Sequence, residues 1–234
     1  MENKQQYKNY YRLNKLKNNK SNKKKKVLKV IKIDDKLTSE FTSIIFFDLE
    51  MNYSFHKEEN HGVGETISIG AVKYNISAEE TTEFYSIIRP TFNNVMSSKI
   101  IELTNLLQDE VNEAKSFKEV LLTLEDWVKQ EKCIFVSWGP DDIRVLLGDN
   151  DRNEYKLDII NTIKTNFIDF QSEYGLHRKS NQAISLKNAL TYYKVEFEGS
   201  QHNALDDAHN LFRVYKKYKE EIIYINSIDN ENSK

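Results

Sequence analysis

The sequence contains few of the residues that cross-link or interrupt a chain. Its 234 residues include one cysteine, two prolines and seven glycines. Because Cys133 stands alone, an internal disulfide is excluded and a reducing compartment is expected. No stretch approaches 18 uninterrupted apolar residues, and no apolar segment follows the N-terminus, so neither a membrane-spanning helix nor a secretion signal is predicted. We therefore expect a cytoplasmic protein that does not associate with membranes.

Acidic residues are scarce at the N-terminal end of the chain and outnumber the basic residues in the rest. Residues 1–38 hold 13 basic and 3 acidic residues, whereas the remainder holds 21 and 33, so a net +10 stands against a net −12. A segment so rich in Lys and Asn is predicted to be a disordered arm. It is either a solubilising tail or a contact for nucleic-acid phosphates, while the acidic body favours cations.

The apolar pattern predicts one α/β domain between two polar ends. We expect a basic arm at residues 1–38, a globular domain at residues 39–225 and a polar tail at residues 226–234. Strands are predicted where β-branched and aromatic residues cluster, at residues 43–50, 65–75, 82–89, 133–138 and 166–170. Three neighbouring strands followed by alternating strands and helices favour a mixed five-stranded sheet flanked by helices.

Local signals place helices and loops between these strands. Ser116 precedes Glu119 by three residues, the capping-box spacing at the start of an amphipathic helix. Thr104 is the predicted N-cap of a shorter helix, and residues 52–64 have the composition of a polar loop. From residue 203 onward, apolar residues recur at the spacing of a long helix.

Two carboxylates alternate on the first predicted strand. Side chains alternate across a strand, so Asp48 and Glu50 share one face while Phe47, Leu49 and Met51 take the other. At about 4 Å, two such charges repel by roughly 4 kcal/mol at an effective dielectric constant of 20. A divalent cation would remove that repulsion, and a strand end that reaches solvent is the ordinary alternative.

Three further groups lie far along the chain. Asp142 follows Trp138-Gly139 at a strand-to-helix junction, although spacing alone does not distinguish it from its neighbour Asp141. Asp207 falls in the first turn of the last helix, where the helix dipole stabilises any acid. His202 precedes that turn, and a lone histidine there is ordinarily a surface or capping residue. Only a fold that gathers these residues would give them a common function.

In this order, the motifs resemble those of DEDDh-type exonucleases in the DnaQ-like, ribonuclease H-like superfamily. The first motif is FDLE, the second SWGPDD and the third HNALDD. ETISIGAV resembles the strand after the first motif, and ELTNLLQDEV resembles the Leu-Thr loop at the substrate end. The resemblance spans residues 43–217 and is strongest to the Eri-1/KapD-like exoribonuclease branch. Pro140 and the LTN triplet depart from the usual pattern.

The resemblance implies a metal-dependent 3′–5′ exonuclease that releases nucleoside 5′-monophosphates from a free 3′ end. Two divalent cations, Mg²⁺ or Mn²⁺, would be held by Asp48, Glu50, Asp142 and Asp207. His202 would be the general base, because an imidazole exchanges a proton near neutral pH. The W-G-x-x-D spacing of such enzymes selects Asp142 over its neighbour.

The same resemblance suggests how the substrate is held. Met51, Leu103 and Thr104 would contact the terminal nucleotide, although core packing explains Leu103 equally well. Single-stranded nucleic acid is the expected partner, with RNA favoured over DNA, since unpaired bases can stack on apolar side chains. The basic arm would hold the upstream strand. The alternatives are a DNA-directed proofreading-type exonuclease acting in trans and a non-catalytic regulator with the same fold.

Overall fold

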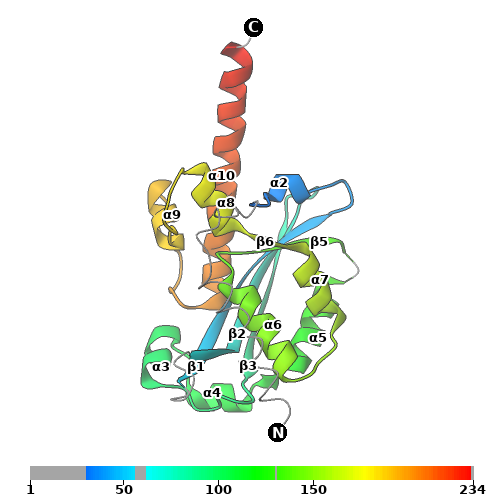
Figure 1. The fold of residues 1–234 in the computed structure, drawn as a ribbon, viewed down its shortest axis with the longest axis vertical. Coiled ribbons are helices and arrows are strands. Elements are labelled where there is room, and N and C mark those ends of the chain that lie inside the picture. The colour runs from blue at the N-terminus through cyan, green and yellow to red at the C-terminus, as the bar shows by residue number, and fades with distance from the viewer. Residues whose placement is uncertain (1–29, 56–61, 130, 233–234) are drawn as a thin grey trace, which may run out of the picture.

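The computed structural model describes residues 30–55, 62–129 and 131–232. Most of the predicted basic arm, residues 1–29, lies outside the described residues. Figure 1 shows a central sheet with helices on both of its faces and a long C-terminal helix that projects beyond it. Among the described residues, no helix combines the length and the apolarity that crossing a membrane requires.

A mixed six-stranded sheet forms the centre of the fold. Its strands are β1 (Ser43–Phe55), β2 (Gly62–Asn75), β3 (Thr81–Arg89), β4 (Lys115–Ser116), β5 (Cys133–Ser137) and β6 (Phe167–Asp169). They lie in the order β4-β3-β2-β1-β5-β6, with the β1–β2 and β2–β3 pairs antiparallel and the other pairs parallel. The α/β class and the mixed sheet are confirmed. The predicted count of five omitted β4, because two residues are too short to show a strand periodicity.

Helices cover the two faces of the sheet and bury separate apolar clusters. On one face lie α5 (Phe117–Val128), α6 (Asp141–Arg152) and α7 (Asp158–Asn166). On the other lie α2 (Ile33–Lys36), α8 (Phe170–His177), α9 (Leu186–Tyr192) and α10 (Ala204–Asn232). Two short helices, α3 (Ser98–Thr104) and α4 (Gln108–Glu113), follow β3 and enclose a third, smaller cluster. Alternation along β1 sends Phe46 into the α10 face and Phe47 into the α5 face.

The capping signals were correct for one helix and wrong for another. Ser116 and Glu119 form the predicted capping box at the start of α5. The N-cap of α3 is Ser97, whose hydroxyl accepts from the Ile100 N–H, and not Thr104, which is the last residue of that helix. The helix that follows Thr104 is α4, which begins at Gln108 with Leu107 as its N-cap, so Thr104 caps neither helix at its start.

The folded part of the chain reaches into both predicted ends. Ile33 is 1% exposed, and its N–H donates to the buried Glu173 carboxylate at 2.8 Å. Helix α10 continues past residue 225 to Asn232 without interruption. Regular structure therefore occurs inside the predicted arm, in α2, and continues past residue 225, in α10.

Candidate active site

The first two carboxylates come from the middle of the sheet. Asp48 and Glu50 lie on the face of β1 that α10 covers, and both are partly buried. Asp48 is opposite Gly70 of β2 in the strand register, and the register shifts between Glu50 and Met51. The alternation predicted for this strand is observed, since Phe47 and Leu49 pack into the opposite cluster.

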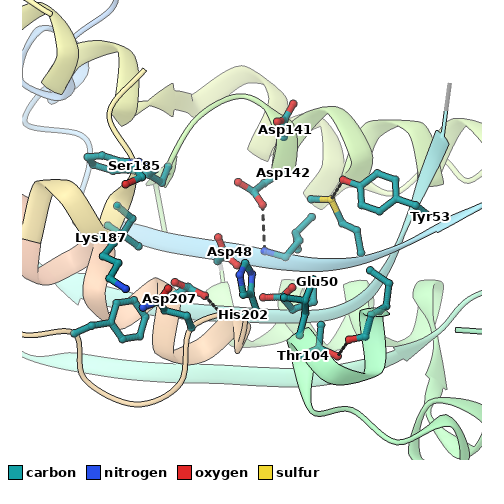
Figure 2. Close-up of a pocket in the computed structure, with 18 residues that line it drawn as sticks. Asp48, Glu50, Tyr53, Thr104, Asp141, Asp142, Ser185, Lys187, His202 and Asp207 are labelled. Atoms are coloured by element: carbon teal, nitrogen blue, oxygen red, sulfur yellow. Dashed lines mark hydrogen bonds between the residues drawn. The ribbon is translucent and has the colours of Figure 1, made fainter. Parts of the chain in front are cut away.

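Helix α10 brings the third carboxylate to this strand. A Cβ atom at Gly70 would lie 2.2 Å from the backbone carbon of Ala204, so only a glycine lets α10 begin directly over β2. From this position, one carboxylate oxygen each of Asp48, Glu50 and Asp207 lie within 4.8 Å of one another. Figure 2 shows the three side chains converging on one point. Close backbone contact thus creates the carboxylate cluster.

Asp142 approaches the cluster from the other side of β1. It lies in the first turn of α6, is 6% exposed, and accepts a hydrogen bond from the Leu49 N–H at 3.2 Å. Asp141 instead points away from the cluster (Figure 2) and forms an exposed ion pair of 2.7 Å with Arg144. Pro140 fits this arrangement because it stands at the N-cap of α6 in a helical conformation. The structure therefore turns Asp142, and not its neighbour, toward β1.

His202 is exposed at the edge of the cluster. Its backbone has a positive φ of 66°, and its N–H donates to Asp207 Oδ2 at 2.8 Å. In Figure 2 the imidazole ring points toward the carboxylates. The neighbouring Asp206 has a structural role, because its Oδ2 accepts from the Ser200 N–H at 2.8 Å. The two adjacent acids of the third motif are thereby separated into one that faces the site and one that fixes the loop before α10.

Burial and mutual repulsion make these acids hard to ionise together. Burial, followed by the charges of Asp142, Asp207 and Glu50, raises the pKa of Asp48 well above its ordinary value. Burial, followed by the charges of Asp207 and Asp142, raises the pKa of Glu50 to about 8. Burial also raises the pKa of Asp142 to about 7 and that of Asp207 to about 6. Converging oxygens with unrelieved negative charge fit a hard divalent cation, which would compensate the repulsion.

The cluster lies in a cavity of about 500 Å³. One wall of this cavity contains the three residues predicted to contact substrate. Met51 is partly buried, Leu103 is 37% exposed and Thr104 is 6% exposed. The Thr104 hydroxyl donates to the Ile100 carbonyl at 2.8 Å, so it stabilises the end of α3. All eight predicted site residues thus line one cavity.

Several lining residues were not identified from the sequence. Tyr53 was assigned to a polar loop, but β1 continues to Phe55 and carries Tyr53 into the cavity. Trp138 and Phe197 contribute aromatic rings, and Lys187 contributes a cation. The W-G-x-x-D motif already pointed to Trp138. Lys187 lies in SLKNAL and Phe197 stands five residues before His202, but neither residue belongs to an acidic motif, so nothing in the sequence placed its side chain in the cavity.

Comparison with known proteins assigns this arrangement to a family. The exonuclease family model matches residues 45–215, most of the chain. The chain belongs to the exonuclease family. The match contains β1, α6 and the start of α10, which together carry all four clustered acids.

The exonuclease relatives confirm the branch to which the motifs were assigned. The chain is 27% identical to ERI1 exoribonuclease 2 of Xenopus laevis, over 74% of this chain and 28% of that protein. It is 29% identical to the 3′-5′ exonuclease eri1 of Schizosaccharomyces pombe, over 58% of this chain and 54% of that protein. The probable 3′-5′ exonuclease KapD of Bacillus subtilis is 22% identical, over 81% of this chain and 89% of that protein. The chain thus spans only about a quarter to a half of the first two relatives.

Solved exonuclease structures share the fold. The nuclease domain of 3′hExo, a DEDDh family member solved with rAMP bound, superposes with a TM-score of 0.67 at 24% identity. The superposition covers 79% of this chain and 95% of that domain. Cell-death related nuclease 4 superposes with a TM-score of 0.65 at 17% identity, over 78% of this chain and 65% of that protein. The predicted ribonuclease H-like architecture of helices around a mixed sheet is therefore confirmed.

Proposed function

We propose that this protein is a metal-dependent 3′–5′ exonuclease that removes nucleoside 5′-monophosphates from single-stranded RNA. The observation that carries the proposal is the convergence of four carboxylates and a histidine in one cavity with an apolar wall beside them. Isolated acids at a strand or helix end have ordinary structural explanations. Four acids brought together from three segments, with pKa values raised by burial, do not.

The carboxylates would hold two divalent cations, Mg²⁺ or Mn²⁺. Asp48, Glu50 and Asp207 supply oxygens close enough to share one ion, and Asp142 would contribute to a second beside Asp48. When bound, such ions polarise the phosphate and stabilise the negative charge of an in-line displacement at phosphorus. Within the protein, the Leu49 N–H fixes the Asp142 carboxylate before any ligand arrives.

His202 would act as the general base. Its ring faces the carboxylates, and its main chain is attached to Asp207 by a hydrogen bond of 2.8 Å (Figure 2). The imidazole would take a proton from the attacking water while Asp207 keeps the loop at a fixed distance from the acids. The water oxygen would then bond to phosphorus as the bond from phosphorus to the 3′-oxygen of the preceding nucleotide breaks. The departing 3′-oxygen takes up a proton from solvent, and the phosphate stays on the 5′-oxygen of the released nucleoside.

The apolar wall would bind the terminal nucleoside. Leu103 near the end of α3 and Met51 on β1 line the same cavity as Glu50 and would offer a surface on which a base or sugar can rest. Helix α3 limits the cavity on that side, so only a chain end would fit there. RNA is favoured as substrate because several of the relatives that the chain matches are named exoribonucleases. A cytoplasmic location suits the single, buried thiol of Cys133.

A gel time course tests this proposal. Single-stranded RNA and DNA of one sequence, each labelled at the 5′ end, would be incubated with Mn²⁺, Mg²⁺ or EDTA. We expect a ladder that shortens from the 3′ end, faster for RNA, that disappears with EDTA and with Asp207→Ala. Asp206→Ala is a less informative control because Asp206 fixes the loop, so Asp126→Ala on α5 serves as the matched acidic substitution. Intact substrate in every lane, with protein shown to be folded, would overturn the proposal.

A further inference from the structure

The cavity contains one cationic side chain among many acids. Five of its lining residues are carboxylates, and Lys187 of α9 is the only Lys or Arg among the lining residues that the structure describes. Lys187 is exposed, and Figure 2 shows its ammonium pointing into the cavity on the side of Asp207. A cation at this place needs an explanation, since Lys187 lies outside the three motifs that carry the acids and the histidine.

The ammonium of Lys187 takes no part in holding the fold together. Across the described ranges, its ammonium has neither an ion pair nor a hydrogen bond, whereas Arg213 and Lys217 on the adjoining α10 are paired with Glu198 and Glu220. Its backbone is nevertheless well fixed. The loop before α9 is bound by Trp138 and Gln171, which both donate to the Ile184 carbonyl at 2.9 Å. The side chain is thus available to a ligand on a rigid support.

The position of Lys187 relative to α3 indicates which way a substrate strand would run through the cavity. The carboxylates lie between the apolar wall, with Leu103 and Met51, and the wall formed by α9 and the loop that follows it, with Lys187 and Phe197. In Figure 2, Thr104 and Lys187 lie on opposite sides of the acids. A strand whose last nucleoside rests against α3 and that runs across the acids would therefore pass Lys187.

We propose that Lys187 binds the phosphate one nucleotide upstream of the bond that is cut. This inference rests on the proposed function and adds a subsite to it. An ammonium is a compact point charge that attracts a phosphate without reading the base, so the contact suits a substrate of any sequence. It also holds the backbone near the acids before the cations have neutralised them. Phe197 on the same wall offers a ring beside that nucleotide.

Two substrates that differ only upstream of the scissile phosphate test the subsite. The p-nitrophenyl ester of uridine 5′-monophosphate has the reacting phosphate and the terminal nucleoside. Hydrolysis breaks its phosphorus–oxygen bond and releases nitrophenolate and UMP. It has no upstream phosphate, whereas an oligouridylate of six nucleotides has the full series. Both would be assayed with saturating Mn²⁺ for the wild type, Lys187→Gln, Lys187→Arg and Lys164→Gln. Lys164 is exposed on α7, on the opposite face of the sheet, and provides the same loss of charge.

We expect Lys187→Gln to lower kcat/KM for the oligomer about five- to tenfold, mainly through KM, and for the ester by less than about twofold. The slope of log KM against the logarithm of the salt concentration should become shallower by the amount that one phosphate contact contributes. Lys187→Arg should restore part of the loss, and Lys164→Gln should resemble the wild type. An equal loss on both substrates, or no loss on either, overturns the subsite. If the wild type hydrolyses neither substrate, the proposed function itself fails.

Discussion

Asp48 and Gly70 face each other across the β1–β2 pair, and the absence of a side chain on Gly70 lets Ala204 lie directly above it. The position of Asp207 beside Asp48 depends on this contact. A residue without chemistry of its own therefore decides whether two segments about 160 positions apart can form one site.

Gly70→Ala should reduce both activity and stability. Its Cβ would meet the backbone of Ala204 at 2.2 Å, which no rotamer change can relieve, so the start of α10 must move away from β1. We expect a loss of about 1–3 kcal/mol in the free energy of unfolding, as for other overpacked cores, and a much weaker response to Mn²⁺. Gly175→Ala in α8 is the matched control, because nothing lies within 4 Å of the added atom. Equal behaviour of the two variants in thermal unfolding with and without Mn²⁺ would contradict this prediction.

Asp142→Asn and Asp141→Asn should differ greatly despite being neighbours. Asp142 is buried against the Leu49 N–H, whereas Asp141 is exposed and paired with Arg144. Loss of a metal-supporting carboxylate should lower kcat about 100-fold or more, while loss of the surface pair should change it by less than about threefold. Steady-state kinetics on single-stranded RNA would measure both. If Asp141→Asn were the damaging variant, the orientation of α6 described above would be wrong.

Metal-free protein should lose stability as the pH rises. The ordinary pKa of an unfolded glutamate is about 4.3, and that of Glu50 in the folded state is raised to about 8. Between these values the folded state binds more protons than the unfolded state, so stability falls with increasing pH. The stability advantage of Glu50→Gln over the wild type, in EDTA, should therefore grow from pH 5 to pH 8. Thermal unfolding at several pH values measures it.

Mn²⁺ should reverse that trend, because the cation replaces the protons that the acids would otherwise need. We expect the increase in Tm on adding Mn²⁺ to be larger at pH 8 than at pH 5.5, and to be small for Glu50→Gln. A metal-induced increase that is the same at both pH values, or that survives in the variant, would mean that Glu50 is not a ligand.

Glu65→Ala should destabilise the loop that leads to α3. The Glu65 carboxylate is 4% exposed and accepts hydrogen bonds from three consecutive backbone N–H groups, those of residues 91–93. Its removal leaves these donors without their acceptor, at a cost of about 2–4 kcal/mol. Glu119→Ala at the exposed capping box of α5 should cost only about 1 kcal/mol. Chemical denaturation compares the two, and a similar cost for both would contradict the assigned role of Glu65.

Much of the fold could be predicted because its strands and helices have regular apolar periodicities. Alternation along β1 already placed Asp48 and Glu50 on one face, and the ordered motifs connected them with His202 and Asp207. β4 was missed because it has two residues. Thr104 was wrongly expected to be an N-cap, because a threonine between two apolar runs fits the start of a helix, whereas here it ends α3 and α4 has Leu107 at its N-cap.

The rest of the site depends on contacts between elements that are far apart in the sequence, and no local sequence pattern predicts such contacts. Asp141 and Asp142 are adjacent acids at one helix start. The motif spacing of the family that the sequence resembles favoured Asp142, but the physical reason, the contact of Asp142 with the Leu49 N–H of β1, comes only from the fold. Lys187 enters the cavity because α9 packs beside α10, a relation between helices separated by an irregular loop. Such residues can be recognised as part of the site only once the helices and strands have been placed in the fold.

The most direct test of the central claim is the chemical identity of the product. Single-stranded RNA of twelve nucleotides would be digested with Mn²⁺, and the products separated by chromatography at successive times, for the wild type and Asp48→Asn. We predict nucleoside 5′-monophosphates that appear in the order of the sequence from its 3′ end, and no release by the variant. Nucleoside 3′-monophosphates, internal fragments or an equally active variant would contradict the assignment of the four carboxylates.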